Sequence, residues 1–267
     1  MILKLLEQQT LTQHMKQQSD RGFIKKPNLP AGEVATVAIS ADAVEAIEKL
    51  TGMGIKILSV HRNCSLPTPV ASHTDLQMLH LKENMFLVSD EHLFTGELQK
   101  KIIINTISTK LGNKYPADVP LNCKIIGNNI ILNKRTTARE VLEFAENEGL
   151  NVINVNQGYS GCSVCVINDS AIITDDESIF TAAQNFLNDV LLIQKGSIRL
   201  NGYNYGFIGG CCGKISKNKL AVNGRIESHS DYNRIIDFTA KHGTEIIELT
   251  DGYITDIGGI IPIIEKL

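Results

Sequence analysis

Four segments of the chain repeat one order of short apolar runs, turn residues and amphipathic stretches. The segments begin near Met78, Asn122, Cys162 and Cys211. In each, two runs rich in Ile, Leu and Val flank a turn of Asn, Asp, Lys or Gly, which predicts a β-hairpin. A Ser, Thr, Asp or Asn then stands where a helix N-cap belongs, and a third apolar run ends the segment. The repeat is therefore predicted to be a ββαβ unit of about 40 to 50 residues, a period typical of propellers and solenoids.

The helix of the repeat is clearest in residues 137–149, TAREVLEFAENEG. Val141, Leu142 and Ala145 fall on one face of this predicted helix, and Gly149 closes its end.

A fifth unit is divided between the ends of the chain. Residues 33–60 supply a strand, a helix and a strand but lack the first strand of a hairpin, whereas TDIGGIIPI near the C-terminus is a single unattached strand. Pairing the two would close a ring without a free sheet edge. We therefore expect an α/β fold, a five-bladed propeller in one domain. A doubly wound parallel sheet is the alternative, which the recurring hairpins disfavour.

The expected domain covers residues 1–267. Its parts are an N-terminal helical extension (1–30), a first unit (31–70 with 254–267) and four further units (71–114, 115–157, 158–201 and 202–253).

Composition narrows the possible partners. The formal net charge is −3, aromatic residues make up 5%, and tryptophan is absent. A nucleic-acid binder usually has a basic stripe with stacking rings, so we expect no nucleic acid and no anionic membrane surface as partner. No apolar stretch is long enough to span a bilayer, and the N-terminus becomes polar too soon for a secretory signal. Six cysteines are expected as reduced thiols in a cytoplasmic protein.

Three phrases, INVNQGYSGCSVCVI, YGFIGG and DIGGIIPI, together with the five-unit pattern, identify a resemblance to the pentein superfamily. This superfamily includes arginine deiminases, agmatine deiminases, dimethylargininases and amidinotransferases, and the chain is most similar to an uncharacterised bacterial branch of it. The resemblance implies a site at one mouth of a central channel, a guanidino or related small cationic nitrogen compound as ligand, and no cofactor.

His73-Thr74-Asp75 resembles the His-x-Asp pair of these enzymes. The resemblance implies that His73 is the acid–base and that Asp75 grips a cationic substrate. The pair is expected at the start of an inner strand, where alternation points both side chains the same way. The alternative is that the pair is ordinary polarity at the end of a strand.

The position of the nucleophile departs from the superfamily pattern. The enzymes carry their cysteine in the last stretch of the chain, but this chain has Ile260, Ile261 and Pro262 there and no cysteine after Cys212. Cys211 and Cys162 are the candidate substitutes, and His73 is a group that could lower a thiol pKa. Inert packing of small apolar thiols is the alternative for both.

Four further residues are expected to bind substrate: Gln77, Asp251, Asp256 and Tyr159. No metal site is expected, because Cys162 and Cys165 are three residues apart in a predicted strand and point to opposite faces.

Two functions remain open at this point. The first is a hydrolase or transferase acting on a guanidino or amidino compound at the central channel. The second is a non-catalytic protein of the same fold that binds a small metabolite or a protein partner, because the usual C-terminal cysteine is absent.

Overall fold

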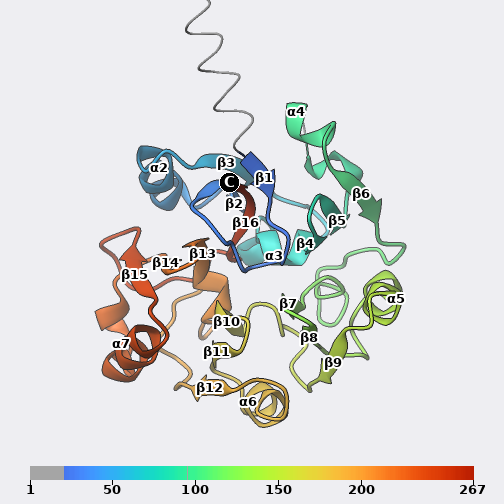
Figure 1. Ribbon diagram of the computed structural model, residues 1–267. Coiled ribbons are helices and arrows are strands. Elements are labelled where there is room, and N and C mark those ends of the chain that lie inside the picture. The colour runs from blue at the N-terminus through green and yellow to red at the C-terminus, as the bar shows by residue number, and fades with distance from the viewer. Residues whose placement is uncertain (1–20, 95) are drawn as a thin grey trace, which may run out of the picture.

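The computed structural model describes residues 21–94 and 96–267. Five small sheets surround a common centre, with the longer helices on the outside (Figure 1). The first sheet contains β1 (Arg21–Phe23), β2 (Val34–Ser40), β3 (Lys56–Val60) and β16 (Ile260–Lys266), in the order β1-β16-β2-β3.

The four other sheets have three strands each. They are β4 (Met78–Lys82), β5 (Met85–Val88) and β6 (Ile103–Thr106); β7 (Lys124–Ile126), β8 (Asn129–Leu132) and β9 (Asn151–Asn154); β10 (Val164–Asn168), β11 (Ala171–Thr174) and β12 (Asp189–Leu192); and β13 (Cys212–Ser216), β14 (Lys219–Val222) and β15 (Glu245–Glu248).

The helical segments are α2 (Val44–Gly52), η1 (Thr68–Val70), α3 (Thr74–Gln77), η2 (Glu91–Leu93), α4 (Gly96–Gln99), α5 (Arg139–Asn147), α6 (Glu177–Ala183), η3 (Gly209–Cys211), η4 (Ile226–Ser228) and α7 (Tyr232–Lys241). Within residues 21–94 and 96–267, every helix is too short or too polar to cross a bilayer.

Each three-stranded sheet is built as the repeat predicts. The first two strands form an antiparallel hairpin, and the third strand returns through a helical segment and pairs in parallel with the second. The expected partner of the unattached C-terminal strand is also confirmed, because β16 pairs antiparallel with β2, with Ile261 opposite Ala38.

The apolar core is divided into clusters that lie between neighbouring sheets. One cluster joins the second and third sheets around α5, and others join the third to the fourth around α6, the fourth to the fifth around α7, and the fifth to the first around α2. A further cluster joins the first and second sheets. Each fully buried Leu, Ile or Val side chain contributes roughly 1.5 to 3 kcal/mol to the free energy of folding. The stability of every sheet therefore depends on its packing against both neighbouring sheets.

Backbone hydrogen bonds near the centre connect successive units. Gly210 N donates to Cys162 O at 3.0 Å, Gly259 N donates to Gly210 O at 2.7 Å, and Asp75 N donates to Gly258 O at 3.1 Å. The Asn122 side chain completes the series by donating to Asp75 O at 3.2 Å. Residues far apart in sequence are thereby held around one point.

Two expectations need correction. Residues 21–23, inside the predicted helical extension 1–30, form strand β1, because their backbone pairs with the outer edge of β16; residues 1–20 lie outside the described chain. His73 and Asp75 do not start a strand: His73 is the N-cap of α3 and Asp75 lies within this short helix. Strand β4 begins only at Met78, so alternation along a strand does not orient the pair.

Candidate active site

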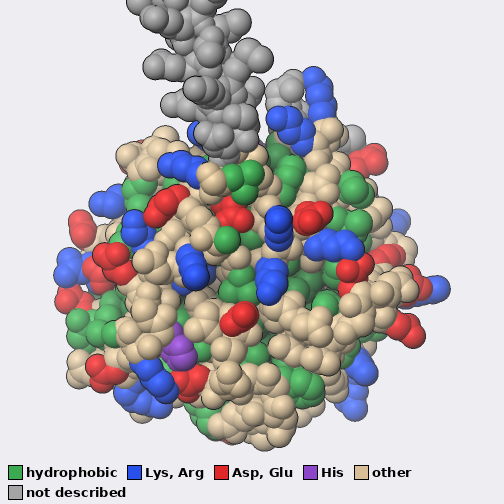
Figure 2. Space-filling model, in the orientation of Figure 1, with side chains coloured by type: hydrophobic (Ala, Val, Ile, Leu, Met, Phe, Trp, Pro, Cys, Tyr) green, Lys and Arg blue, Asp and Glu red, His purple; other side chains and the backbone are tan. Residues whose placement is uncertain are grey.

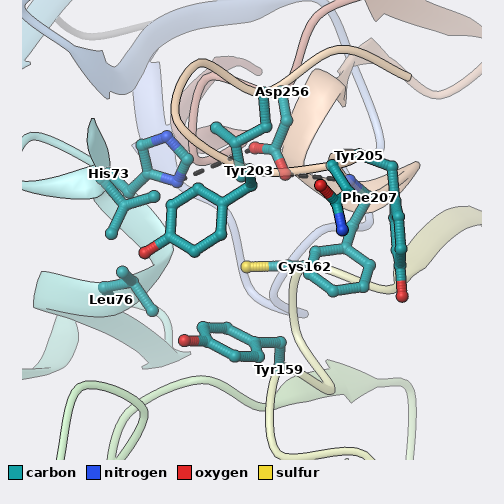
Figure 3. A pocket seen from close by; sticks show the side chains of 11 residues that line it. His73, Leu76, Tyr159, Cys162, Tyr203, Tyr205, Phe207 and Asp256 are labelled. Carbon is teal, nitrogen blue, oxygen red and sulfur yellow. Dashed lines mark hydrogen bonds and ion pairs between the residues drawn. The ribbon is translucent and has the colours of Figure 1, made fainter. Parts of the chain in front are cut away.

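A pocket of about 210 Å³ opens where loops from several units meet (Figure 3). His73, Cys162 and Asp256 line it with an imidazole, a thiol and a carboxyl group, and the aromatic rings of Tyr159, Tyr203, Tyr205 and Phe207 form much of its wall. Figure 3 shows the Cys162 sulfur between the rings of Tyr203, Tyr159 and Phe207, with His73 and Asp256 above it in this view. The structure thus brings together one cysteine, one histidine and one carboxylate that come from three different units.

Cys162 is held by a network from two other units. Its thiol donates to Asp75 Oδ2 at 2.9 Å, and Asn122 Nδ2 donates to its sulfur at 3.0 Å. Asn122 Oδ1 accepts from the backbone N–H groups of Gly161 and Cys162, at 2.8 and 3.1 Å. The side chain of Cys162 is therefore fixed from both its backbone and its sulfur.

Burial and nearby negative charge keep this thiol protonated. Burial raises the pKa of Cys162 well above its ordinary value, and the carboxylates of Asp75 and Asp256 raise it further. Only the hydrogen bond from Asn122 acts in the opposite direction. A positive charge placed beside these carboxylates would offset their part of the rise in the thiol pKa.

Asp256 is the carboxylate on the pocket wall. Its two oxygens accept backbone hydrogen bonds from Gly258 N at 3.0 Å and Phe207 N at 2.9 Å, and Oδ1 lies 3.8 Å from His73 Nδ1. Burial raises the pKa of Asp256, with a further contribution from Asp75, whereas His73 acts to lower it.

Two glycines leave room for the close packing of His73 and Asp256 in the site. A Cβ on Gly258, whose φ is +78°, would lie 2.4 Å from the His73 Cα, and a Cβ on Gly210 would lie 2.1 Å from Asp256 Oδ1. Neither position could hold a larger side chain without moving the site.

Asp75 lies behind Cys162, and it does not line the pocket that holds His73 and Asp256. Instead it borders a cavity of about 20 Å³ on the other side, next to Lys124 and Gly259. Its Oδ1 is buried without a partner among the described groups. This placement suits a group that accepts the thiol proton better than one that grips a substrate.

Tyr159 lines the pocket, and its hydroxyl donates a hydrogen bond to Asp118. The ring stacks near Phe207, with centroids 5.7 Å apart, and Phe207 is in edge contact with Tyr205. Burial raises the pKa of Tyr159, and Asp118 adds to the effect. The phenol therefore stays neutral, and its oxygen can still accept a hydrogen bond from a ligand.

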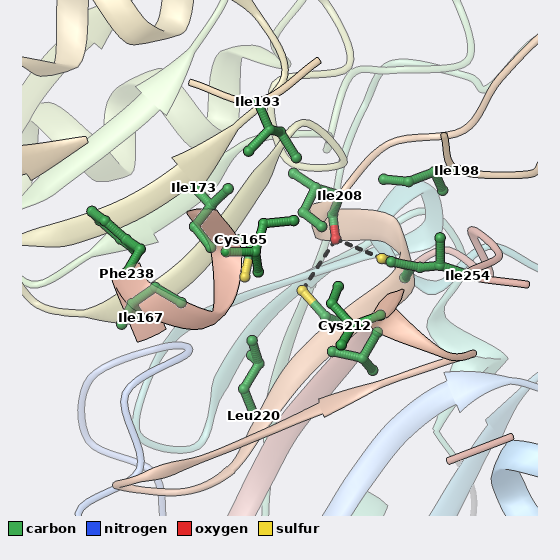
Figure 4. Packing of buried hydrophobic residues seen from close by; sticks show 14 of the residues in the cluster. Cys165, Ile167, Ile173, Ile193, Ile198, Ile208, Cys212, Leu220, Phe238 and Ile254 are labelled. Atoms are coloured by element: carbon green, nitrogen blue, oxygen red, sulfur yellow. Dashed lines mark hydrogen bonds between the residues drawn. The ribbon is translucent and has the colours of Figure 1, made fainter. Parts of the chain in front are cut away.

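The other sequence-predicted residues lie outside the pocket. Cys211 is fully buried in an apolar cluster, and its thiol donates to Ile208 O at 3.0 Å, as does the thiol of Cys212 at 3.1 Å (Figure 4). Gln77 donates to the backbone carbonyls of His61 and Ala71. Asp251 is solvent-exposed beside Arg225.

Four residues of the site were missed from the sequence: Asn122, Asp118, Tyr203 and Phe207. Asn122 directly precedes the cysteine of LNCKII, and the observed pairing of the hairpins aligns it with Ser163, one residue after Cys162. The local pattern therefore did not mark Asn122 as a partner of the Cys162 thiol.

Within the described residues, no group of three or more His, Cys, Asp or Glu side chains is arranged to hold a metal ion. All six cysteines are free thiols, and Cys64 is the exposed one.

Comparison with solved structures shows the fold. SxtG, an amidinotransferase from Microseira wollei in the saxitoxin biosynthetic pathway, matches with a TM-score of 0.53 and 11% identity, over 86% of this chain and 92% of that one. DDAH from Pseudomonas aeruginosa, in a complex with citrulline, matches with a TM-score of 0.48 and 11% identity, over 88% of this chain and 100% of that one.

An agmatine deiminase from C. jejuni matches less well, with a TM-score of 0.37 and 11% identity, over 85% of this chain and 72% of that one. No curated protein matches by sequence. The expected resemblance to the pentein superfamily is confirmed at the level of fold.

A family model described as "Family of unknown function (DUF6873)" matches residues 38–261. This range includes His73, Asp75, Cys162 and Asp256 and covers most of the chain. The protein therefore belongs to the DUF6873 family.

Proposed function

We propose that this protein is an enzyme that acts on a guanidinium or amidinium group through a covalent intermediate on Cys162. The observation that carries the proposal is the position of the Cys162 thiol, 2.9 Å from Asp75 and in one aromatic-walled pocket with His73 and Asp256. A planar cation suits such a pocket, because aromatic faces and buried carboxylates both attract positive charge.

Binding of a cationic substrate would activate the Cys162 thiol. Burial and two carboxylates raise the pKa of the thiol, so a bound guanidinium that compensates the charge of the carboxylates would lower this pKa. Asp75 Oδ2 already accepts the hydrogen bond of the thiol and is therefore placed to take its proton. The nucleophile would form only when substrate is present.

The chemistry follows in two steps. The sulfur attacks the guanidinium carbon and forms a C–S bond, while the π electrons of the C=N bond move to nitrogen. The bond to the leaving nitrogen then breaks, its electron pair taking a proton from His73, which leaves an amidino group on Cys162. Attack by water or by an acceptor amine, deprotonated by His73, breaks the C–S bond and restores the thiol.

The similarity to SxtG supports this proposal at the level of fold, since that protein is an amidinotransferase. We also propose that the five sheets are the blades of a closed propeller in a single domain. The first unit includes strand β1 in addition to residues 31–70 and 254–267, and the other unit boundaries are those expected from the sequence. The free thiols support a cytoplasmic location.

The test is an assay of simple guanidines and amidines for release of ammonia or amine, combined with mass spectrometry of the intact protein. We expect turnover, and a mass increase on Cys162 after acid quenching. The variants Cys162→Ser and His73→Ala should lose activity by at least about 10²-fold, whereas Cys64→Ala, at an exposed thiol, should keep it. Turnover that survives Cys162→Ser would refute the proposed nucleophile.

A second candidate function is binding of a cationic metabolite without turnover. It is favoured by the raised pKa of the Cys162 thiol and by Ile260 and Ile261 at the start of β16, where the related enzymes carry a cysteine. Saturable binding of a guanidine, with no product and no adduct over long incubation, would support this function instead.

A further inference from the structure

The aromatic side chains of this chain are concentrated in the candidate active site. Aromatic residues make up 5% of the sequence, but three of the six tyrosines line the pocket that holds Cys162. The wall consists mainly of aromatic and aliphatic side chains: Tyr159, Tyr203, Tyr205, Phe207, Val70, Leu76 and Leu200. Such a wall favours a flat apolar group over a polar chain next to the thiol and the carboxyl group.

Three of these rings are held by contacts with one another. The Tyr159 and Phe207 rings are stacked, with centroids 5.7 Å apart and an angle of 24° between their planes. The Tyr205 ring meets the Phe207 ring edge-on, with centroids 5.8 Å apart. Tyr115 also contacts the Tyr159 ring, with centroids 6.0 Å apart. One wall of the pocket is therefore a packed aromatic surface.

Tyr203 is the ring of the pocket that has no such neighbour. In the part of the chain that the structure describes, it stacks on no other aromatic ring, and the residue is 43% exposed. Figure 3 shows the Tyr203 ring on one side of the Cys162 sulfur and the Phe207 ring on the other. A flat ring that entered between them would cover exposed area of Tyr203 and give it an aromatic partner.

Backbone hydrogen bonds hold these rings in a fixed relation to the carboxylate. Phe207 N donates to Asp256 Oδ2 at 2.9 Å, and Tyr203 N donates to Leu200 O at 3.1 Å within the loop that connects β12 to η3. Gly202, directly before Tyr203, has a φ of +80°, a turn conformation that glycine adopts readily. A cation bound at Asp256 is therefore placed directly beside the aromatic wall.

We infer that the substrate is an aryl amidine or aryl guanidine, whose reacting carbon is bonded directly or through one nitrogen to a flat aromatic or heteroaromatic ring; this inference rests on the proposed function of the pocket. The amidinium group contacts Asp256 and Cys162, and the ring lies between Tyr203 and the packed wall that contains Phe207. Tyr203 is then a specificity-determining residue, because its ring is the one in the wall that still lacks an aromatic partner. A puckered or open-chain substituent of similar size cannot stack on it.

The experiment is isothermal titration calorimetry with three amidines: benzamidine, cyclohexanecarboxamidine and acetamidine. All three carry the same cation, and the first two have rings of equal size that differ in being flat and aromatic or puckered and saturated. We expect benzamidine to bind about three- to tenfold more tightly than cyclohexanecarboxamidine, as one aromatic pair provides beyond the burial of area. Acetamidine, which has no ring, should bind more weakly than both.

Variants assign this preference to one residue. Tyr203→Leu keeps an apolar side chain but removes the ring, so benzamidine and cyclohexanecarboxamidine should then bind with equal affinity, whereas Tyr203→Phe should keep the preference. Tyr232→Leu is the matched control, because Tyr232 is a similarly exposed tyrosine, at 38%, that lies at the start of α7 and outside the pocket. It should bind all three amidines as the unaltered protein does.

The outcomes separate the two levels of argument. If the amidines bind but benzamidine binds no more tightly than cyclohexanecarboxamidine, or if Tyr203→Leu retains the full preference, the inference is wrong and the proposed function stands. If none of the three amidines binds to the folded protein, the proposed function fails and the inference fails with it.

Discussion

Two adjacent aspartates at the end of β11 should affect stability in opposite directions. Asp175 is 2% exposed, and its Oδ1 is buried without a partner in the described chain. Burial raises the pKa of Asp175 from 3.8 to about 7, with Lys195 opposing this shift and the carboxylates of Asp176 and Asp256 adding to it. The folded chain therefore holds a proton on Asp175 more tightly than the unfolded chain does.

The size of the effect follows from linkage. A carboxyl group with a raised folded pKa contributes no penalty below pH 3.8, and folding loses stability as the pH rises toward 7. A difference of about three pKa units corresponds to about 4 kcal/mol above pH 7, at 1.36 kcal/mol for each unit. Asp175→Asn removes the charge and should make the protein more stable at pH 8 by up to about 4 kcal/mol, with little change at pH 4.

Urea unfolding monitored by circular dichroism measures the free energy of unfolding of Asp175→Asn and of the unaltered protein at pH 4 and at pH 8. Asp176→Ala is the matched control, since Asp176 is the N-cap of α6 and its Oδ1 accepts from Ser178 N at 2.9 Å and Ile179 N at 3.1 Å. Loss of this N-cap should destabilise the protein by about 1 kcal/mol. A stability change for Asp175→Asn that is equal at the two pH values, or that is destabilising at pH 8, would refute the reasoning.

Three further predictions concern the site and the core. Asn122→Ala removes four hydrogen bonds around Cys162 and Asp75 and should lower the free energy of unfolding by about 2 to 4 kcal/mol, measured by urea titration; an unchanged midpoint would contradict it. Gly210→Ala places a Cβ against Asp256 and should abolish ligand binding in calorimetry, whereas Gly52→Ala, with open space around it, should bind normally; equal binding by both contradicts the packing argument. Burial lowers the pKa of His80 to about 4, so stability should fall by about 3 kcal/mol as the pH drops from 6.5 to 4. His80→Gln should reduce this acid sensitivity in thermal melts at pH 7 and pH 4.5, and an unaltered sensitivity would assign it to other groups.

The sheets could be predicted from the sequence because their signals are local. Two short runs of Ile, Leu and Val that flank an Asn- or Gly-containing turn indicate a hairpin from local sequence alone. Four hairpins formed as expected. The pairing of β16 with β2 was also predictable, since each was a strand without the partner that the repeat requires.

The interior of the site was less predictable, because it depends on contacts between units. Cys162 and Cys211 have similar sequence surroundings, but a short 3-10 helix turns the Cys211 thiol into the apolar core, toward Ile208 O. The position of Asp75 behind Cys162 follows from the helical turn of α3, which the strand pattern did not indicate. Surface charge does not mark a site either. Lys, Arg, Asp and Glu side chains are interspersed over the face of the molecule shown in Figure 2.

The central claim is that Cys162 becomes reactive when a planar cation binds in the pocket beside Asp256 and offsets the negative charge that raises the pKa of the thiol. It is tested most directly by comparing alkylation with 2-chloroacetamidine, a cation, and 2-chloroacetamide, its neutral counterpart, with each cysteine assigned by peptide mass spectrometry. We predict that the amidine labels Cys162 faster than the amide by at least about tenfold, that Asp256→Asn removes this difference, and that exposed Cys64 reacts without such a preference. Equal slow labelling of Cys162 by both reagents, with Cys64 the main product, would contradict the account.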